Sequence, residues 1–142
     1  MDEDTERLLR GTADKALDYL RSLPDRHVGA REDARTIASR IGGPLPEASE
    51  DAAAVLDRMI RDVDPGIVAA AGPRYFGFVI GGTLPASLAA DWMTAAWDQN
   101  TAVHALSPAG AAAEQVAGEW MLDLLGLPAG WSTGLPTGAG LG

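Results

Sequence analysis

The sequence contains no cysteine and only one lysine, Lys15, among its 11 basic residues; the other ten are arginines. The lack of cysteine excludes disulfides, thiolate nucleophiles and cysteine metal sites, and it fits a reducing cytoplasm. A reaction that needs a Schiff-base lysine has a single candidate in this chain.

Long hydrophobic runs and clustered positive charge are also absent. The most apolar stretch, residues 76–90, is broken by three glycines and a proline, so it is too interrupted to span a bilayer. Residues 2–4 are acidic, whereas a secretory signal would begin with basic residues. The net charge is −9, so neither nucleic acid nor an acidic membrane surface is an expected partner. We expect a soluble, cytoplasmic protein.

The composition that remains is that of a globular domain, with 46% hydrophobic and 22% charged residues. Apolar spacing predicts helices over residues 4–22 and 32–41, a third from a cap at Ser49 to Pro65, and a fourth from Pro85 to about residue 98. A last helix begins at Ser107 and ends near residue 126. Residues 74–80 have the composition of an extended strand. Lys15 lies off the apolar stripe of its helix and should point to solvent.

Few residues have spacing that predicts chemistry. His27 is expected on a surface loop, and His104 in an apolar neighbourhood before the last helix. No second ligand accompanies either histidine at metal-binding spacing, so we predict no metal site. The segment WDQN at 97–100 is either an ordinary helix end or the wall of a pocket.

The glycines at 138–142 could bind a phosphate through backbone N–H groups. A dinucleotide site would also need a strand before them and a helix after them. Pro136 disrupts the strand, so a nucleotide-binding function ranks below the alternatives given below.

The order of several segments is more informative than any one of them. They are GPRYFGFV (72–79), GGTLPA (81–86), WDQN (97–100), SPA (107–109), WMLDLLGLP (120–128) and GLPTGA (134–139). Together they resemble the group II pyridoxal-phosphate (PLP) dependent decarboxylases, which act on glutamate, aromatic amino acids, histidine and tyrosine. The resemblance covers most of the chain and is most specific over residues 65–128.

This resemblance implies a fold in which the present chain is mainly α. Residues 1–64 would form an N-terminal helical dimerisation segment. Residues 65–142 would begin the large α/β PLP-binding domain of the aspartate-aminotransferase-like fold (fold type I). The parent enzyme would be a homodimer acting on an amino acid.

The resemblance also implies site residues. The loop matching Gly138, Ala139 and Gly140 binds the phosphate of PLP in the family, although Gly140 stands where a Thr or Ser is usual. In relatives, the segment that matches Phe78, Val79 and Ile80 lines the substrate pocket. The position that matches His104 lies near a pocket contributed to the neighbouring subunit.

The family's aldimine lysine, its pyridinium aspartate and its ring-stacking histidine match positions downstream of Gly142. Lys15 matches none of these residues. We therefore expect an N-terminal fragment of a PLP-dependent carboxy-lyase that is inactive alone, does not retain PLP and exposes apolar faces. The alternative is a helical interaction module that pairs with an intact decarboxylase subunit.

Overall fold

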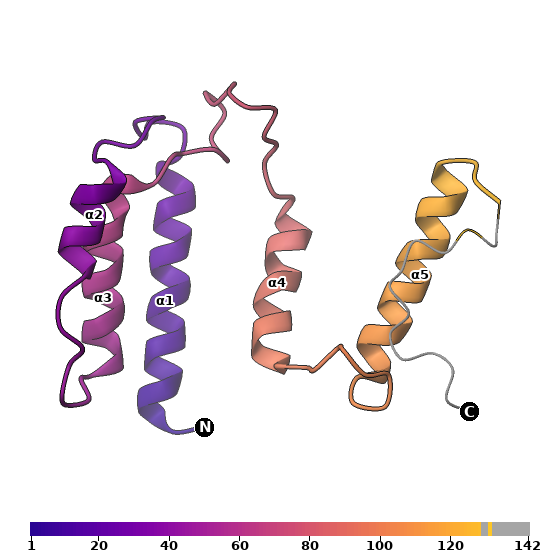
Figure 1. Ribbon diagram of the computed structural model, residues 1–142, viewed down its shortest axis with the longest axis horizontal. Helices are drawn as coiled ribbons and strands as arrows, with labels where there is room; N and C mark the ends of the chain where they lie inside the picture. Colours follow the sequence, from indigo (N-terminus) through magenta and orange to yellow (C-terminus); the bar gives the residue numbers. More distant parts are fainter. Residues whose placement is uncertain (129–130, 132–142) are drawn as a thin grey trace. The chain divides into compact units, whose positions relative to one another are not determined.

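The computed structural model describes residues 1–128 and 131 (Figure 1). All regular secondary structure in these residues is helical, which confirms the prediction of a mainly α chain. The chain forms two compact units, residues 1–83 and 84–142. No described helix is long and apolar enough to cross a membrane.

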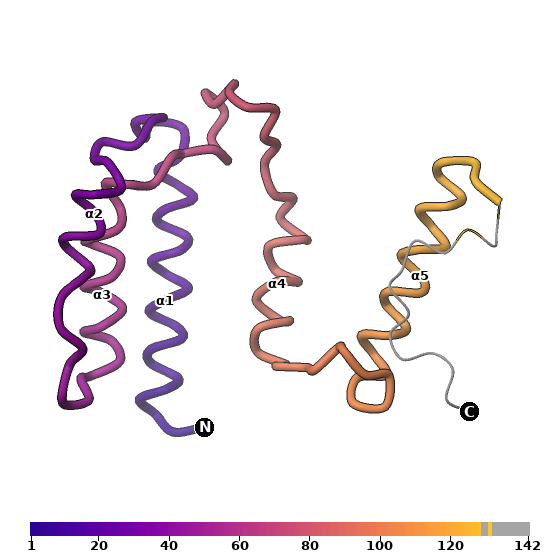
Figure 2. Tube along the Cα trace, in the orientation of Figure 1, coloured from indigo at the N-terminus to yellow at the C-terminus, as the bar shows by residue number. Residues whose placement is uncertain are grey.

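The first unit contains three α-helices, and Figure 2 follows its trace from indigo to magenta. They are α1 (Glu3–Ser22), α2 (Ala34–Ile41) and α3 (Ala52–Val63), and a short 3-10 turn, η1 (Asp64–Gly66), follows α3. The bounds of α1 and α2 agree with the apolar spacing of the sequence to within two residues.

Each helix of this unit begins at an aspartate that accepts a backbone hydrogen bond from the residue three positions later. The caps are Asp2, Asp33 and Asp51, with N···O distances of 2.7, 2.8 and 2.9 Å. Such a carboxylate satisfies one of the free N–H groups of the first turn and also favours the positive helix end. The predicted cap of α3 at Ser49 is therefore wrong, because the charged Asp51 fills that role two residues later.

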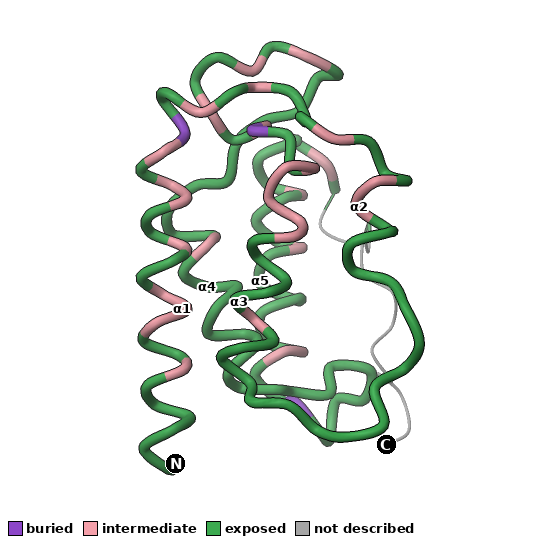
Figure 3. Tube along the Cα trace, turned by 90° about the vertical axis from the view of Figure 1, so that its left-hand side faces the viewer, coloured by how far each residue is buried: buried purple, intermediate pink, exposed green. Residues whose placement is uncertain are grey.

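Packing in the first unit centres on α2, α3 and η1, which contact one another. Gly66 makes a close approach possible, since a Cβ built there would lie 2.8 Å from Cγ1 of Ile37. The buried apolar residues are Leu23 and Ala69, where the chain after α1 meets the chain after η1. Figure 3 shows how little of the trace is buried.

The second unit contains α4 (Pro85–Trp97) and α5 (Pro108–Leu124), both with proline in the first turn. The predicted cap of α5 is confirmed, because the buried Ser107 hydroxyl accepts the N–H of Gly110 at 3.2 Å. Helix α4 ends at Asp98, whose φ of 47° is left-handed and stops the helix. Aspartate tolerates this conformation better than most residues.

The prediction of an extended segment at residues 74–80 is wrong. Two turns form there, closed by Tyr75 N–H to Gly72 O (3.2 Å) and Ile80 N–H to Gly77 O (3.3 Å). A strand needs a partner for its backbone groups, and no described segment supplies one. The run therefore satisfies its backbone through turns despite its strand-like composition.

Large apolar side chains are exposed in both units, which confirms the expected exposed apolar faces. On α5, Trp120 is 69% exposed and Leu124 is 84% exposed, and on α4 Trp97 is 62% exposed. These apolar side chains of α4 and α5 are therefore not covered in this structure. A helix whose apolar stripe meets no neighbour is typical of an interaction surface.

Candidate functional site

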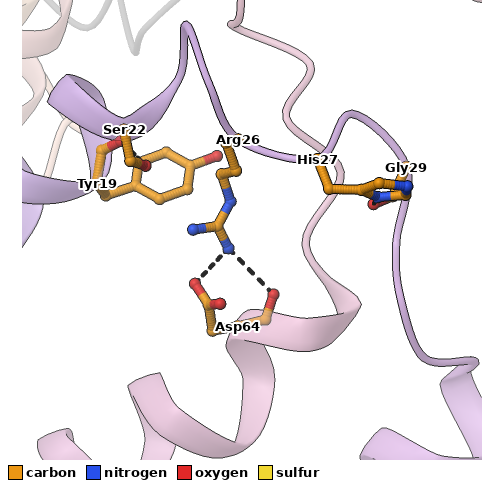
Figure 4. A network of polar contacts seen from close by, with 6 residues as sticks. All are labelled: Tyr19, Ser22, Arg26, His27, Gly29 and Asp64. Atoms are coloured by element: carbon orange, nitrogen blue, oxygen red, sulfur yellow. Dashed lines mark hydrogen bonds and ion pairs between the residues drawn. The ribbon is translucent and has the colours of Figure 1, made fainter.

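The most developed polar cluster of the structure is built around Arg26, in the loop that follows α1 (Figure 4). Its Nη2 donates to the side-chain carboxylate of Asp64 and, at 3.3 Å, to the backbone carbonyl of the same residue. The guanidinium carbon lies 5.0 Å from the centre of the Tyr19 ring, within the range of a cation–π contact. Arg26 thus joins the end of α1 to η1.

Neighbouring loop residues extend this cluster. Nη2 of Arg74 donates to the carbonyl oxygen of Arg26 at 2.5 Å. Nδ1 of His27 lies 2.8 Å from the carbonyl oxygen of Gly29, so the ring is held against its own loop. His27 is exposed, which confirms its prediction as a surface loop residue.

Three of the predicted substrate-pocket residues lie together in one exposed turn. Phe78 and Val79 both have φ of 55°, and they are 91% and 105% exposed; Ile80 follows them. Positive φ at both central residues is the pattern of a type I′ turn, which normally selects Gly or Asn. For a β-branched residue such as Val79 this conformation is unusual and strained. The turn therefore presents two apolar side chains to solvent, and it holds them in a backbone conformation that is unfavourable in free energy.

His104, the fourth predicted pocket residue, belongs to the other unit. It lies in a turn closed by Leu106 N–H to Val103 O at 2.9 Å, and it is exposed. The predicted phosphate-binding residues, Gly138, Ala139 and Gly140, lie outside the described residues.

Lys15, the single lysine, is exposed as predicted, although it also forms an ion pair. Its Nζ lies 3.2 Å from a carboxylate oxygen of Asp57, so it bridges α1 and α3. Both side chains remain about half exposed. A Schiff-base lysine must instead present its amine to the carbonyl carbon of the cofactor. In this structure the Lys15 amine instead faces a carboxylate of α3.

Shifted pKa values occur at helix caps and at ion pairs on helix surfaces. The backbone N–H of Thr5 lowers the pKa of Asp2, and that of Thr36 lowers the pKa of Asp33. The Arg58 guanidinium likewise lowers the pKa of Glu50, which it contacts at 2.6 and 2.9 Å. These shifts report local structure, because each perturbing group is a helix N–H or an adjacent arginine.

The cluster around Arg26 was not predicted from the sequence. Its partner Asp64 lies 38 residues away, and no local spacing links the two. The only available signal was the position of each residue, since Arg26 lies four residues after the predicted helix 4–22 and Asp64 lies beside Pro65, where another predicted helix ends.

The sequence matches no protein-family model and no curated protein. Among solved structures, the chain is similar to the Oryza sativa protein TDC, crystallised with PLP and tryptamine. The two chains are 21% identical and superpose with a TM-score of 0.80 over 96% of this chain. This chain spans 29% of the length of TDC. The likeness shows that the two proteins share a fold over this segment.

Proposed function

We propose that this chain is the N-terminal part of a PLP-dependent amino-acid decarboxylase of fold type I, and that its role is assembly rather than bond breaking. The observation that carries the proposal is the fold shared with TDC over 96% of the chain. Tryptamine is the amine left when tryptophan loses its carboxylate, so the ligands of TDC fit decarboxylation. The order of the segments in residues 72–128 supports the same family.

The residues that are present suit assembly better than the chemical step. When bound, PLP acts as an electron sink for the reacting amino acid. The described residues supply no lysine placed to hold it, since Lys15 is paired with Asp57. We therefore assign the chemistry to residues of the longer protein, and assign to Gly138, Ala139 and Gly140 one edge of the phosphate site.

The exposed turn at Phe78 and Val79 supports a contribution to the substrate pocket. Covering these two apolar side chains with another surface would stabilise the structure and offset the cost of the strained turn. We propose that Phe78, Val79, Ile80 and His104 form pocket walls in the assembled enzyme, which would be a cytoplasmic homodimer. The substrate would be an amino acid whose side chain reaches this apolar wall.

Sequencing the coding DNA beyond the codon for Gly142 tests this proposal. We expect an open frame that leads into a downstream His–Lys pair. The long protein should then show the absorbance of PLP held as a Schiff base and release CO₂ from one or more amino acids. The chain of residues 1–142 should do neither. A stop codon directly after Gly142 would contradict the enzyme function of this chain.

A second function is favoured by the exposed apolar faces of α4 and α5. A helical module with such faces could pair with an intact decarboxylase subunit and regulate its assembly. Mixing the chain with such a subunit would then give a stable heterodimer without added cofactor, detectable by sedimentation. The first proposal predicts instead that the chain is continuous with its own catalytic domain.

A further inference from the structure

A small cavity of about 50 Å³ lies in the first unit, between loop residues 26–31 and 64–67. Its two walls are held together by backbone hydrogen bonds. The N–H of Arg31 donates to Pro65 O at 2.7 Å, and the N–H of Ala69 donates to Val28 O at 2.9 Å. A single water molecule needs about 10–15 Å³ of such space, so this volume holds only a few atoms. The cavity therefore fits a single small group.

Positive charge gathers at this cavity although the whole chain carries a net charge of −9. Two arginines, Arg26 and Arg31, line it together with His27, and Asp64 is the one carboxylate in the lining. Arg74 adds a further guanidinium beside the loop through its bond to Arg26 O. The carboxylate of Glu32, next to Arg31, is engaged by Arg40 at 2.7 Å. The carboxylate of Asp25, next to Arg26, belongs to an exposed residue outside the lining.

Arg31 differs from most cations of the chain. Eight of the 11 basic residues form an ion pair within the described residues, whereas the side chain of Arg31 forms none there. Arg26 uses its Nη2 for both hydrogen bonds to Asp64, and Figure 4 shows the two bonds starting from that one nitrogen. Two guanidinium groups at one cavity thus retain N–H donors.

We propose that this cavity binds a small oxyanion of the phosphate class, held by Arg31 and by the remaining N–H donors of Arg26. Guanidinium groups bind phosphate oxygens through paired, charge-assisted hydrogen bonds, which are stronger than neutral ones. Contact with Tyr19 and Asp64 fixes the orientation of Arg26 before the anion arrives. Ordering a single side chain, Arg31, then completes the site.

Titration of the chain of residues 1–142 with inorganic phosphate, followed by backbone amide NMR at constant ionic strength, tests the site. We expect saturable shifts confined to residues 26–31 and 64–67. Arg31→Gln should weaken phosphate binding by about tenfold or more, because it removes charge-assisted hydrogen bonds. Its backbone N–H to Pro65 is retained, and an unchanged circular dichroism spectrum would confirm that the variant folds.

Arg35→Gln is the matched control. Arg35 is exposed, also forms no ion pair among the described residues, and lies on α2 outside the cavity. This variant should bind phosphate as the unchanged chain does. Equal losses in both variants, shifts spread over all the arginines, or no saturable shift would overturn the proposal. Binding of acetate as tight as that of phosphate would overturn the assignment to the phosphate class.

Discussion

Arg26 and Asp64 are joined by one arginine nitrogen that binds both the side-chain carboxylate and the backbone carbonyl of the aspartate. The Arg26 side chain is only 19% exposed, whereas the exposed fraction of Asp64 is 45%. Of the two long-range ion pairs among the described residues, Arg26–Asp64 and Lys15–Asp57, the first has the less exposed cation, and its guanidinium also contacts the Tyr19 ring. It holds the end of α1 to η1, and so orders the loop that carries the proposed anion site.

Replacing Arg26 with methionine should destabilise the first unit. The change leaves a carboxylate and a carbonyl without their donor, which costs about 1–3 kcal/mol of unfolding free energy. Urea unfolding followed by circular dichroism measures this loss. The control is Arg7→Met, because Arg7 and Asp4 form an exposed pair on α1 and its loss should cost less than about 1 kcal/mol. Equal effects of the two changes would contradict the role given to Arg26.

Two glycines should respond to alanine in opposite directions. A Cβ at Gly66 would lie 2.8 Å from Cγ1 of Ile37, so Gly66→Ala forces η1 and α2 apart and should cost about 1–3 kcal/mol. At Gly11, inside α1, a Cβ meets nothing within 4 Å. Gly11→Ala should therefore stabilise the helix by about 0.5–1 kcal/mol. Thermal unfolding of both variants measures the difference. A stabilising Gly66→Ala would contradict close packing between Gly66 and Ile37.

The helices of this chain could be predicted from sequence because their signals are local. An apolar stripe, a capping aspartate or serine and a stop residue such as Gly126 all lie within a few turns of one another. The long-range contacts could not be predicted, since nothing near Arg26 indicates that its partner is Asp64. The strand predicted at 74–80 does not form for the same reason, because strand formation depends on a neighbouring strand among the described residues. The predicted cofactor residues at 138–140 lie outside the described residues and stay a prediction.

Acid should weaken α2 through its cap. The pKa of Asp33 is lowered by the Thr36 N–H in the folded chain, so its contribution is present above the unfolded pKa and is lost as the pH falls through the folded one. The amide shift of Thr36 should follow this titration at pH values below the ordinary pKa of an aspartate. Asp33→Asn should keep the cap while removing the titration, since asparagine also caps helices. As a control, Asp14→Asn on α1 should leave the Thr36 titration unchanged. If the amide shift of Thr36 titrated in the same way in Asp33→Asn, that result would contradict this cap.

The apolar face of α5 should make the isolated chain associate with itself. Leu124 is 84% exposed, and burying such a side chain contributes about 1.5–3 kcal/mol. Leu124→Glu should therefore raise the concentration at which association begins by about tenfold or more, as measured by sedimentation. Gln115→Glu places the same charge beside Glu119, with which Gln115 forms a hydrogen bond, and should have little effect. A chain that stays monomeric at all concentrations would contradict the interaction surface.

Lys15 provides a test of where the chemistry resides. In the longer decarboxylase that we propose, Lys15→Arg should keep the ion pair with Asp57, because arginine carries the same charge at a similar reach. Both the absorbance of bound PLP and the rate of CO₂ release should then stay unchanged. Substitution of the downstream lysine by arginine is the matched control and should abolish both signals, since the guanidinium cannot form the imine that holds the cofactor.

Loss of the PLP signal in the Lys15 variant would place the reacting amine in α1 instead. Such a result would contradict the assignment of this chain to assembly, because α1 would then have to enter the catalytic centre. The present geometry argues against that outcome. The Lys15 amine is held by a carboxylate of α3, and that contact would have to break before the amine could react. The comparison of the two lysine variants therefore separates a structural role of the helices from a chemical one.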